Sequence, residues 1–181
     1  MKSIYRLLCL LSCLSSLGWM SSCTSSQSSD SSIAKARKDT IENIAEEYFE
    51  TYANREDWES FLSFYAEDLK FEDAILQVHL DSLEAFKAFY DWPNPGFRKH
   101  PDYPEIFNLE DLVVDDSTAV GRGVFHPFYW QDTLFRMEWD PTFTIWLWFD
   151  DSLKIHRQVD WVEYSGNVLM SVGERIEKGD Y

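Results

Sequence analysis

Cysteine is absent from the chain after Cys23, because the other two cysteines, Cys9 and Cys13, lie before it. The rest of the chain therefore has no disulfide and no cysteine metal site, and its stability must come from a hydrophobic core. The four histidines are scattered singly, without the spacing of metal ligands. We therefore expect neither a metal nor a cofactor.

Basic residues are also scarce. The chain has 16 lysines and arginines against 32 aspartates and glutamates, a formal net charge of −16. Such a chain is repelled by phosphate backbones and by anionic lipid surfaces. We therefore expect no binding to nucleic acids, and membrane attachment only through a lipid anchor.

The first 22 residues are typical of an export signal. Lys2 and Arg6 precede an apolar segment that is too short to span a bilayer, and small residues stand directly before Cys23. This order resembles a bacterial lipoprotein signal, which implies cleavage before Cys23 and attachment of lipid to that residue. The alternative is a plain secretory signal cut nearby.

Residues 23–32 are rich in serine and predict a flexible tether. Residues 33–181 then form one domain. Thr24 is not the aspartate that retains some lipoproteins in the inner membrane. We therefore expect a cell-envelope protein, lipid-anchored in the outer membrane of a Gram-negative bacterium.

The first half of the domain has helical periodicity. Asp39 and Glu42 fit a capping box before a helix, and Asp57 fits the start of a second one. Asp81 and Glu84 fit the start of a third, which must end near Pro93. The apolar positions of these helices include Tyr48, Tyr52, Trp58, Phe61, Phe86, Phe89 and Tyr90.

The second half is rich in β-branched and aromatic residues, separated by turn formers such as the two DDS triplets at 115–117 and 150–152. In residues 143–149, the alternation places Phe143, Ile145, Leu147 and Phe149 on one face and Trp146 and Trp148 on the other. Both faces are apolar, so helices are expected on one and a partner subunit on the other. The order of elements predicts an α+β fold.

The segments YANREDWESFLSFYAEDLKFED and LKIHRQVDWVE, together with this order of elements, resemble the nuclear transport factor 2-like superfamily and its SnoaL-like branch. That branch includes polyketide cyclases, ketosteroid isomerases and limonene-epoxide hydrolases. The resemblance spans roughly residues 40–165. It implies a cone-shaped, curved mixed or antiparallel sheet (nuclear transport factor 2-like, cystatin-like) packed on three N-terminal helices, a pocket inside the cone, and a homodimer formed through the sheet.

Asp73 falls where the resemblance places the proton-abstracting carboxylate of ketosteroid isomerases. Those enzymes also need a stabiliser for the developing oxyanion. The tyrosine position of that stabiliser matches Phe49, with Tyr48 one residue off, and its aspartate position falls near Ile145. The base is therefore present without its oxyanion hole. The alternative role of Asp73 is that of a turn residue closing its strand.

The predicted last strand carries a second carboxylate. Asp160 lies where epoxide hydrolases of this fold have an aspartate, but their Arg–Asp pair has no match on the preceding strand. His156, Gln158 and Asp160 alternate, so we expect them on one face of the strand. An imidazole, an amide and a carboxylate in a row suffice for acid–base chemistry. Pairing of Asp160 with an arginine, and a half-exposed His156, are the alternatives.

Three functions are compatible with these features. The first is a lipid-anchored domain that binds a small, largely apolar molecule in the cone. The second is an acid–base enzyme of the cyclase, isomerase or hydrolase type using Asp73 with Asp160 or His156, and the third is an interaction module using the Trp146/Trp148 face. The incomplete enzyme patterns favour binding. The expected ligand-binding residues are Tyr48, Tyr52, Trp58, Phe89 and Gln158, with residues 91–104 as a lid or partner surface.

Overall fold

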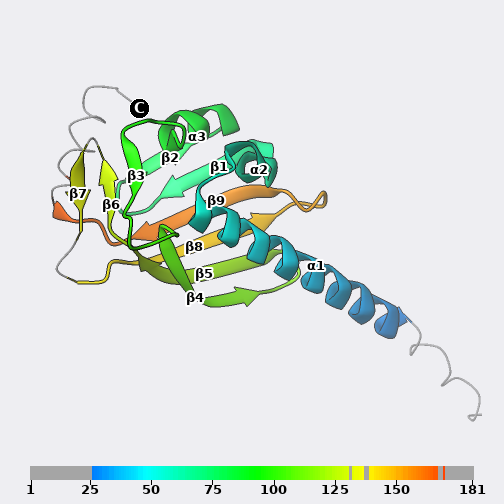
Figure 1. The fold of residues 1–181 in the computed structure, drawn as a ribbon. Helices are drawn as coiled ribbons and strands as arrows, with labels where there is room; N and C mark the ends of the chain where they lie inside the picture. Colours follow the sequence, from blue (N-terminus) through cyan, green and yellow to red (C-terminus); the bar gives the residue numbers. More distant parts are fainter. Residues whose placement is uncertain (1–25, 131, 137–138, 167–168, 170–181) are drawn as a thin grey trace, which may run out of the picture. The chain divides into compact units, whose positions relative to one another are not determined.

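The computed structural model describes residues 26–130, 132–136, 139–166 and 169 (Figure 1). The chain divides into two compact units, Met1–Ala34 and Lys35–Tyr181. The expected signal peptide, residues 1–22, and the expected lipidation site, Cys23, lie outside the described residues. Among those described, no helix is long and apolar enough to cross a membrane.

The helices and strands of the described chain follow in this order: α1 (Ser26–Asn54), α2 (Trp58–Ser63), β1 (Tyr65–Asp73), β2 (Val78–Leu80), α3 (Leu83–Tyr90), β3 (Phe97–Lys99), β4 (Phe107–Val114), β5 (Thr118–Phe125), β6 (Phe128–Trp130), β7 (Thr133–Phe135), β8 (Thr142–Phe149) and β9 (Ile155–Val162).

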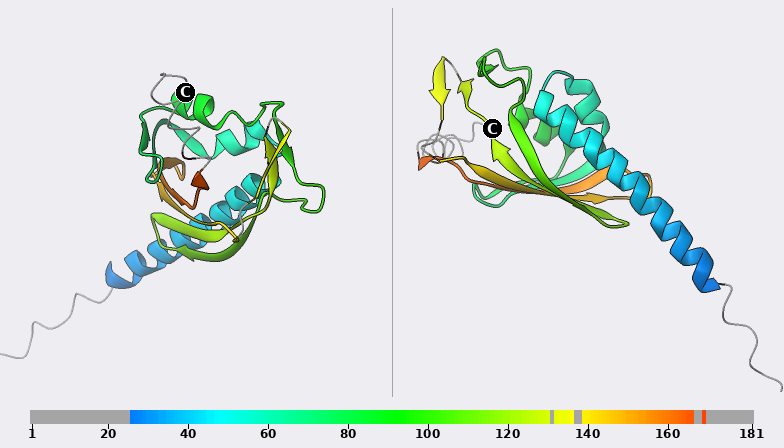
Figure 2. Two further views of the ribbon diagram at one scale, coloured as in Figure 1. Left: turned by 90° about the vertical axis from the view of Figure 1, so that its left-hand side faces the viewer. Right: turned by 60° about the horizontal axis from the view of Figure 1, so that its bottom comes forward.

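A curved sheet with the strand order β2-β1-β9-β8-β5-β4 forms the body of the second unit. β1 and β9 run parallel, and the other neighbouring strands are antiparallel. Figure 2 shows the sheet curving around the helices, which lie against its concave face. The α+β prediction with a curved mixed sheet is confirmed.

Helix α1 begins earlier than predicted. Its first residue is Ser26, so residues 26–32 of the expected tether are helical, and Asp39 lies inside the helix rather than at a capping box. No glycine or proline occurs between residues 26 and 38 to stop the helix. The Asp39 carboxylate instead accepts a hydrogen bond from Lys35, one turn earlier, at 2.8 Å.

The apolar stripe of α1 is confirmed, because Ile41, Ala45, Tyr48, Phe49 and Tyr52 are all buried. Its close approach to the sheet depends on β5. The Phe49 ring packs directly over Gly121, where an added Cβ would lie 2.2 Å from the ring. This contact fixes how far the concave face lies from the helix.

The two shorter helices have side-chain caps. Asp57 accepts a hydrogen bond from the Ser60 backbone N–H at 2.9 Å, as predicted for the second helix. The third helix begins one residue later than expected, because Ser82, not Asp81, caps the Ala85 N–H at 3.2 Å. Asp81 instead forms an ion pair with Lys70, with 3.2 Å between Oδ1 and Nζ.

The alternation predicted for β8 is confirmed. Its Phe143, Ile145, Leu147 and Phe149 are buried against the helices. Trp146 is 40% exposed on the convex face, where its ring stacks with Trp148, and Trp161 of β9 is 52% exposed. The homodimer through this face stays a prediction.

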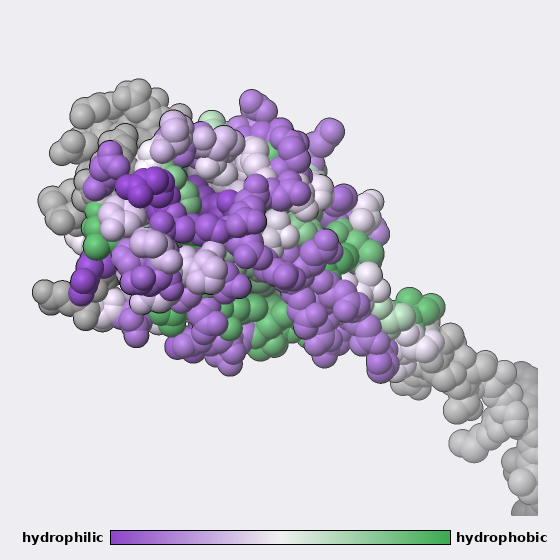
Figure 3. Space-filling model, viewed as in Figure 1, coloured by the Kyte–Doolittle hydropathy of each residue, from purple (hydrophilic) through white to green (hydrophobic). Residues whose placement is uncertain are grey.

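The side of the molecule seen in Figure 3 is mainly hydrophilic, in keeping with the excess of acidic residues.

Residues 91–104 contribute to a second, small sheet with the strand order β3-β6-β7. Phe97–Lys99 pairs antiparallel with Phe128–Trp130. The same segment sends Trp92 into the core, where its ring lies 4.2 Å from that of Phe61. The segment is therefore built into the fold, and its role as a lid stays a prediction.

Candidate functional site

The register of β1 and β9 brings the two predicted carboxylates together. Asp73 and Asp160 are directly paired in the parallel ladder, and the Ala74 N–H donates to the Asp160 carbonyl at 2.9 Å. Both side chains are buried, with 1% and 3% of their surface exposed. Two residues that are far apart in sequence thus form one buried acidic pair on the concave side.

The carboxyl of Asp160 is held by two donors. Tyr90 of α3 donates its hydroxyl to Oδ2 at 2.7 Å, and Gln158 donates its amide to Oδ1 at 2.8 Å. Burial raises the pKa of Asp160 to about 7; the two hydrogen bonds oppose the rise, and the charge of Asp73 adds to it. Asp160 therefore changes its charge near neutral pH.

Gln158 extends this network toward α1. Its Oε1 accepts hydrogen bonds from Tyr65 at 2.7 Å and from Tyr48 at 3.1 Å, and the two hydroxyls lie 3.0 Å apart. The Tyr90 hydroxyl lies 3.3 Å from Gln158 Nε2 and 3.4 Å from the hydroxyl of Tyr52. We call Tyr48, Tyr52, Tyr65, Tyr90, Gln158 and Asp160 the polar cluster.

The tyrosines of the polar cluster keep their protons at neutral pH. Burial raises the pKa of each hydroxyl above its ordinary value, and the charge of Asp160 adds to the rise. Aromatic rings surround them: Phe61 lies within 6.2 Å, centroid to centroid, of Tyr48, Tyr52, Tyr65 and Tyr90. The concave side therefore holds neutral hydrogen-bond donors and two buried carboxyl groups, those of Asp73 and Asp160, in an apolar setting.

Asp73 has the contacts of a turn residue. Its Oδ1 accepts the backbone N–H groups of Ile75 at 3.0 Å and Leu76 at 2.8 Å, and its Oδ2 accepts the hydroxyl of Tyr164. Burial raises the pKa of Asp73, and these three hydrogen bonds oppose the rise. The turn role is present in the structure, and the role of Asp73 in catalysis stays a prediction.

The expectation that His156 shares a face with Gln158 and Asp160 is wrong. Trp148 pairs with Arg157, whereas Phe149 pairs with Ile155, so the register shifts at His156. This irregularity breaks the alternation and leaves His156 exposed. Gln158 and Asp160 still point inward. Arg157 faces the other side, with its guanidinium 4.6 Å from the Trp148 ring centroid.

The predicted ligand-binding residues divide into two groups. Tyr48, Tyr52 and Gln158 belong to the polar cluster. Trp58 and Phe89 are partly buried against the core, and Trp58 lies 5.2 Å from the Trp92 ring, centroid to centroid. These placements show where the side chains lie, and their ligand contacts stay predictions.

Sequence reasoning did not assign Tyr65, Tyr90 and Tyr164 to the site. Tyr65 and Tyr90 were recognisable as interior aromatics, and a buried tyrosine hydroxyl needs a hydrogen-bond partner. That rule signals a buried polar group nearby but does not identify it.

No group of three or more metal-ligating side chains occurs among the described residues.

The comparisons with known proteins identify the fold. No family model matches the chain, and no curated protein matches it. A solved structure from Shewanella denitrificans, described as a SnoaL-like polyketide cyclase, has a TM-score of 0.56 at 16% identity and covers 77% of this chain and 98% of that one. A nuclear transport factor 2-like protein from Anabaena variabilis has a TM-score of 0.53 at 12% identity, covering 82% and 98%.

A structure from Pseudomonas aeruginosa described as a steroid delta-isomerase has a TM-score of 0.51 at 14% identity, covering 76% of this chain and 89% of that one. At such identities the similarity concerns the fold. The chain has the nuclear transport factor 2-like fold, with SnoaL-like proteins among its structural neighbours.

Proposed function

We propose that the protein is a lipid-anchored domain of the cell envelope that binds a small, largely apolar molecule on the concave side of its sheet. The polar cluster is the observation that supports this proposal. Binding sites for small molecules are mostly apolar and contain a few converging polar groups that orient the ligand. Here neutral hydroxyls from α1, β1 and α3 converge with the amide and carboxyl of β9 among aromatic rings.

The aromatic rings favour an apolar ligand body. Phe61 and Phe86, both fully buried, lie beside the polar cluster, and the ring centroids of Phe86 and Tyr90 are 4.3 Å apart. A ligand with one hydroxyl or carbonyl among apolar atoms matches this composition, since its polar atom meets Tyr90, Gln158 or Asp160. Charged ligands without an apolar part do not match it.

The environment-sensitive dye phenylnaphthylamine tests this proposal, because it is apolar and accepts excitation energy from tryptophan. We expect saturable binding with a dissociation constant on the order of micromolar. Replacing Trp58 by Phe should lower the energy transfer, because Trp58 is part of the aromatic core beside Phe61. Fluorescence titration of the purified protein measures both quantities.

The matched control is Trp161→Phe, because Trp161 is exposed on the convex face. This variant should retain most of the energy transfer. If Trp161→Phe lowers the transfer and Trp58→Phe does not, the dye binds outside the sheet and the proposal is wrong.

An acid–base enzyme is the second candidate, favoured by one observation. The pKa of Asp160 at about 7 lies near the pH at which a general base is most effective. A carboxylate in an apolar setting takes a proton from carbon more readily than a solvated one does. Tyr90, which donates to the same carboxyl, would hold it in place.

A nitrobenzisoxazole tests for such a base, because removal of the C3–H proton of its isoxazole ring breaks the N–O bond and opens the ring to a coloured cyanophenolate. We expect the rate to rise with pH to a plateau with a midpoint near 7. Asp160→Asn should lower the plateau rate by about a hundredfold or more. Asp68→Asn, on the exposed part of β1, is the control. Equal rates in the wild type and Asp160→Asn would exclude Asp160 as the base.

A further inference from the structure

Two buried donors have no acceptor in the described part of the chain. They are Nε of Arg55 and Nε1 of Trp92, and no other buried side-chain polar atom of the described residues lacks a partner. Trp92 is only 7% exposed. The two side chains are neighbours, with the Arg55 guanidinium carbon 5.3 Å from the Trp92 ring centroid. The unpartnered donors therefore belong to one place in the fold.

The backbone conformation and the ring stacking of Arg55 position its guanidinium so that Nε has no acceptor among the described residues. Arg55 follows the last residue of α1 in a left-handed conformation, with φ at 48°. Its guanidinium carbon lies 3.9 Å from the ring centroid of Phe97, on β3. Stacking on rings uses the faces of a guanidinium and leaves the N–H groups at its edge available.

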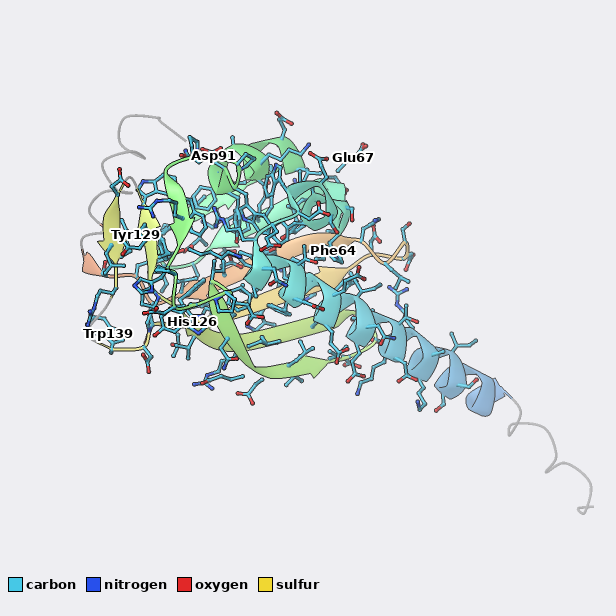
Figure 4. All side chains as sticks on the ribbon, viewed as in Figure 1. Phe64, Glu67, Asp91, His126, Tyr129 and Trp139 are labelled. Carbon is cyan, nitrogen blue, oxygen red and sulfur yellow. The ribbon has the colours of Figure 1, made fainter. Side chains whose placement is uncertain are left out.

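Two acidic side chains are hydrogen-bonded to other groups: Glu56, next to Arg55 in the sequence, and Asp91, whose charge acts on the Arg55 guanidinium. Glu56 accepts a hydrogen bond from Lys99 at 3.1 Å, and Asp91 accepts one from the Asn94 side chain at 2.6 Å. Within the described residues, Arg55 forms no ion pair with a carboxylate within 4.0 Å. Figure 4 shows Asp91 at the end of the molecule that also carries Tyr129, opposite Phe64 and Glu67.

Both free donors are costly in the protein alone. A buried N–H group without an acceptor costs about 1–3 kcal/mol. Burial also lowers the pKa of Arg55, because the charged guanidinium loses contact with water. An oxyanion placed at the two N–H groups would remove both costs, whereas a neutral apolar group would remove neither.

This pair adjoins the polar cluster. The Trp92 ring lies 5.6 Å from that of Tyr52, centroid to centroid, and the Tyr52 hydroxyl faces that of Tyr90. An apolar molecule beside Phe61 would therefore have Asp160 and Tyr90 at one side and the Arg55–Trp92 donors at another. The net negative charge of the chain repels anions from most of its surface. A local cation such as Arg55 therefore confines anion binding to its own site.

We propose that Arg55 and Trp92 bind an oxyanion, such as a carboxylate, carried by the apolar ligand. The Arg55 Nε–H and the Trp92 Nε1–H donate to its oxygens, and the ring faces of Trp92 and Phe97 hold the guanidinium in position. This inference rests on the proposed binding function and narrows its ligand class to apolar molecules with one anionic group.

Two dyes that differ by one sulfonate test the inference: anilinonaphthalene sulfonate and the neutral phenylnaphthylamine. We expect the purified protein to bind the sulfonate about tenfold or more tightly than the neutral dye, at one site per chain. Arg55→Gln should reduce this ratio of affinities to near one. Trp92→Phe keeps an aromatic ring and removes the N–H donor, and it should lower the ratio by several-fold.

The matched control is Arg98→Gln, because Arg98 also stacks on a ring, with its guanidinium carbon 4.6 Å from the Tyr129 centroid, but pairs with exposed Asp132. It should leave the ratio unchanged.

The outcomes separate the two proposals. If both dyes bind equally, or if Arg55→Gln lowers both affinities alike, the oxyanion site is wrong and the binding function stands. If neither dye binds, both are wrong. Tighter binding of the sulfonate that depends on Arg55 supports the inference.

Discussion

The Asp160→Asn variant should gain stability relative to the wild-type protein as the pH rises from about 4 to 8. The buried carboxyl of Asp160 has its pKa raised from an ordinary 3.8 to about 7. A pKa shift of this size means that the stability of the variant relative to the wild type changes by on the order of 4 kcal/mol over this pH range. Asparagine has the same shape and no charge to bury, so it avoids this cost.

The sign of this pH dependence follows from the binding of the Asp160 proton. The folded protein holds the Asp160 proton more tightly than the unfolded chain does, so the contribution of this group to stability is complete below pH 4. It is lost as the pH rises toward 7 and stays lost above that value. The pKa of Asp73 is also raised, so Asp73 contributes with the same sign in both proteins.

Urea unfolding of both proteins at several pH values measures this difference. Asp68→Asn is the control, because it removes an exposed carboxylate of β1 instead of a buried one. A constant difference for Asp160→Asn would show that Asp160 titrates like a solvated aspartate. A difference of opposite slope would show that the hydrogen bonds from Tyr90 and Gln158 outweigh burial.

A destabilising acid in a protein core points to a function for that acid. An apolar or amide side chain at position 160 would fill the same space at lower cost. Asp160 instead makes hydrogen bonds to Tyr90 and Gln158, and through Gln158 to Tyr48 and Tyr65. Both candidate functions use this arrangement, as a polar anchor for a ligand or as a base.

The periodic segments of the sequence predicted the fold well. Alternation in residues 143–149 correctly identified the buried face of β8, because each strand position has one of two environments. The helical stripe containing Tyr48 and Tyr52 was correct for the same kind of reason. Asp57 was correctly identified as a cap, because its role depends on residues only three positions away.

The site was only partly predictable, because it depends on contacts between distant segments. Sequence alternation placed His156 beside Gln158, and a register shift that the strand alone does not encode moved it to the surface. Tyr90 has the spacing of a core residue, and its bond to Asp160 exists only because α3 packs on β1, which pairs with β9. The Arg55–Phe97 contact likewise requires the loop of residues 91–104 to fold back onto the end of α1.

Gly121→Ala should be among the most damaging single substitutions in the protein. An added Cβ would lie 2.2 Å from Cζ of Phe49 and within 2.7 Å of two other atoms of that ring. Phe49 is 1% exposed and packs against the Tyr48 and Phe107 rings, so it cannot move aside. We expect a loss of about 4 kcal/mol or more, or failure to fold, measured by thermal or urea unfolding.

A second substitution distinguishes this clash from a general intolerance of strand β5. Phe49→Leu makes room over position 121, so the double variant Phe49→Leu/Gly121→Ala should be more stable than the sum of the two single effects predicts, by about 1–3 kcal/mol. Gly166→Ala, where an added Cβ meets nothing within 4 Å, should change stability by less than about 0.5 kcal/mol. A mild effect of Gly121→Ala would mean that α1 lies farther from the sheet. Tyr48, next to Phe49, could then not reach Gln158, and the polar cluster would lose its contact with α1.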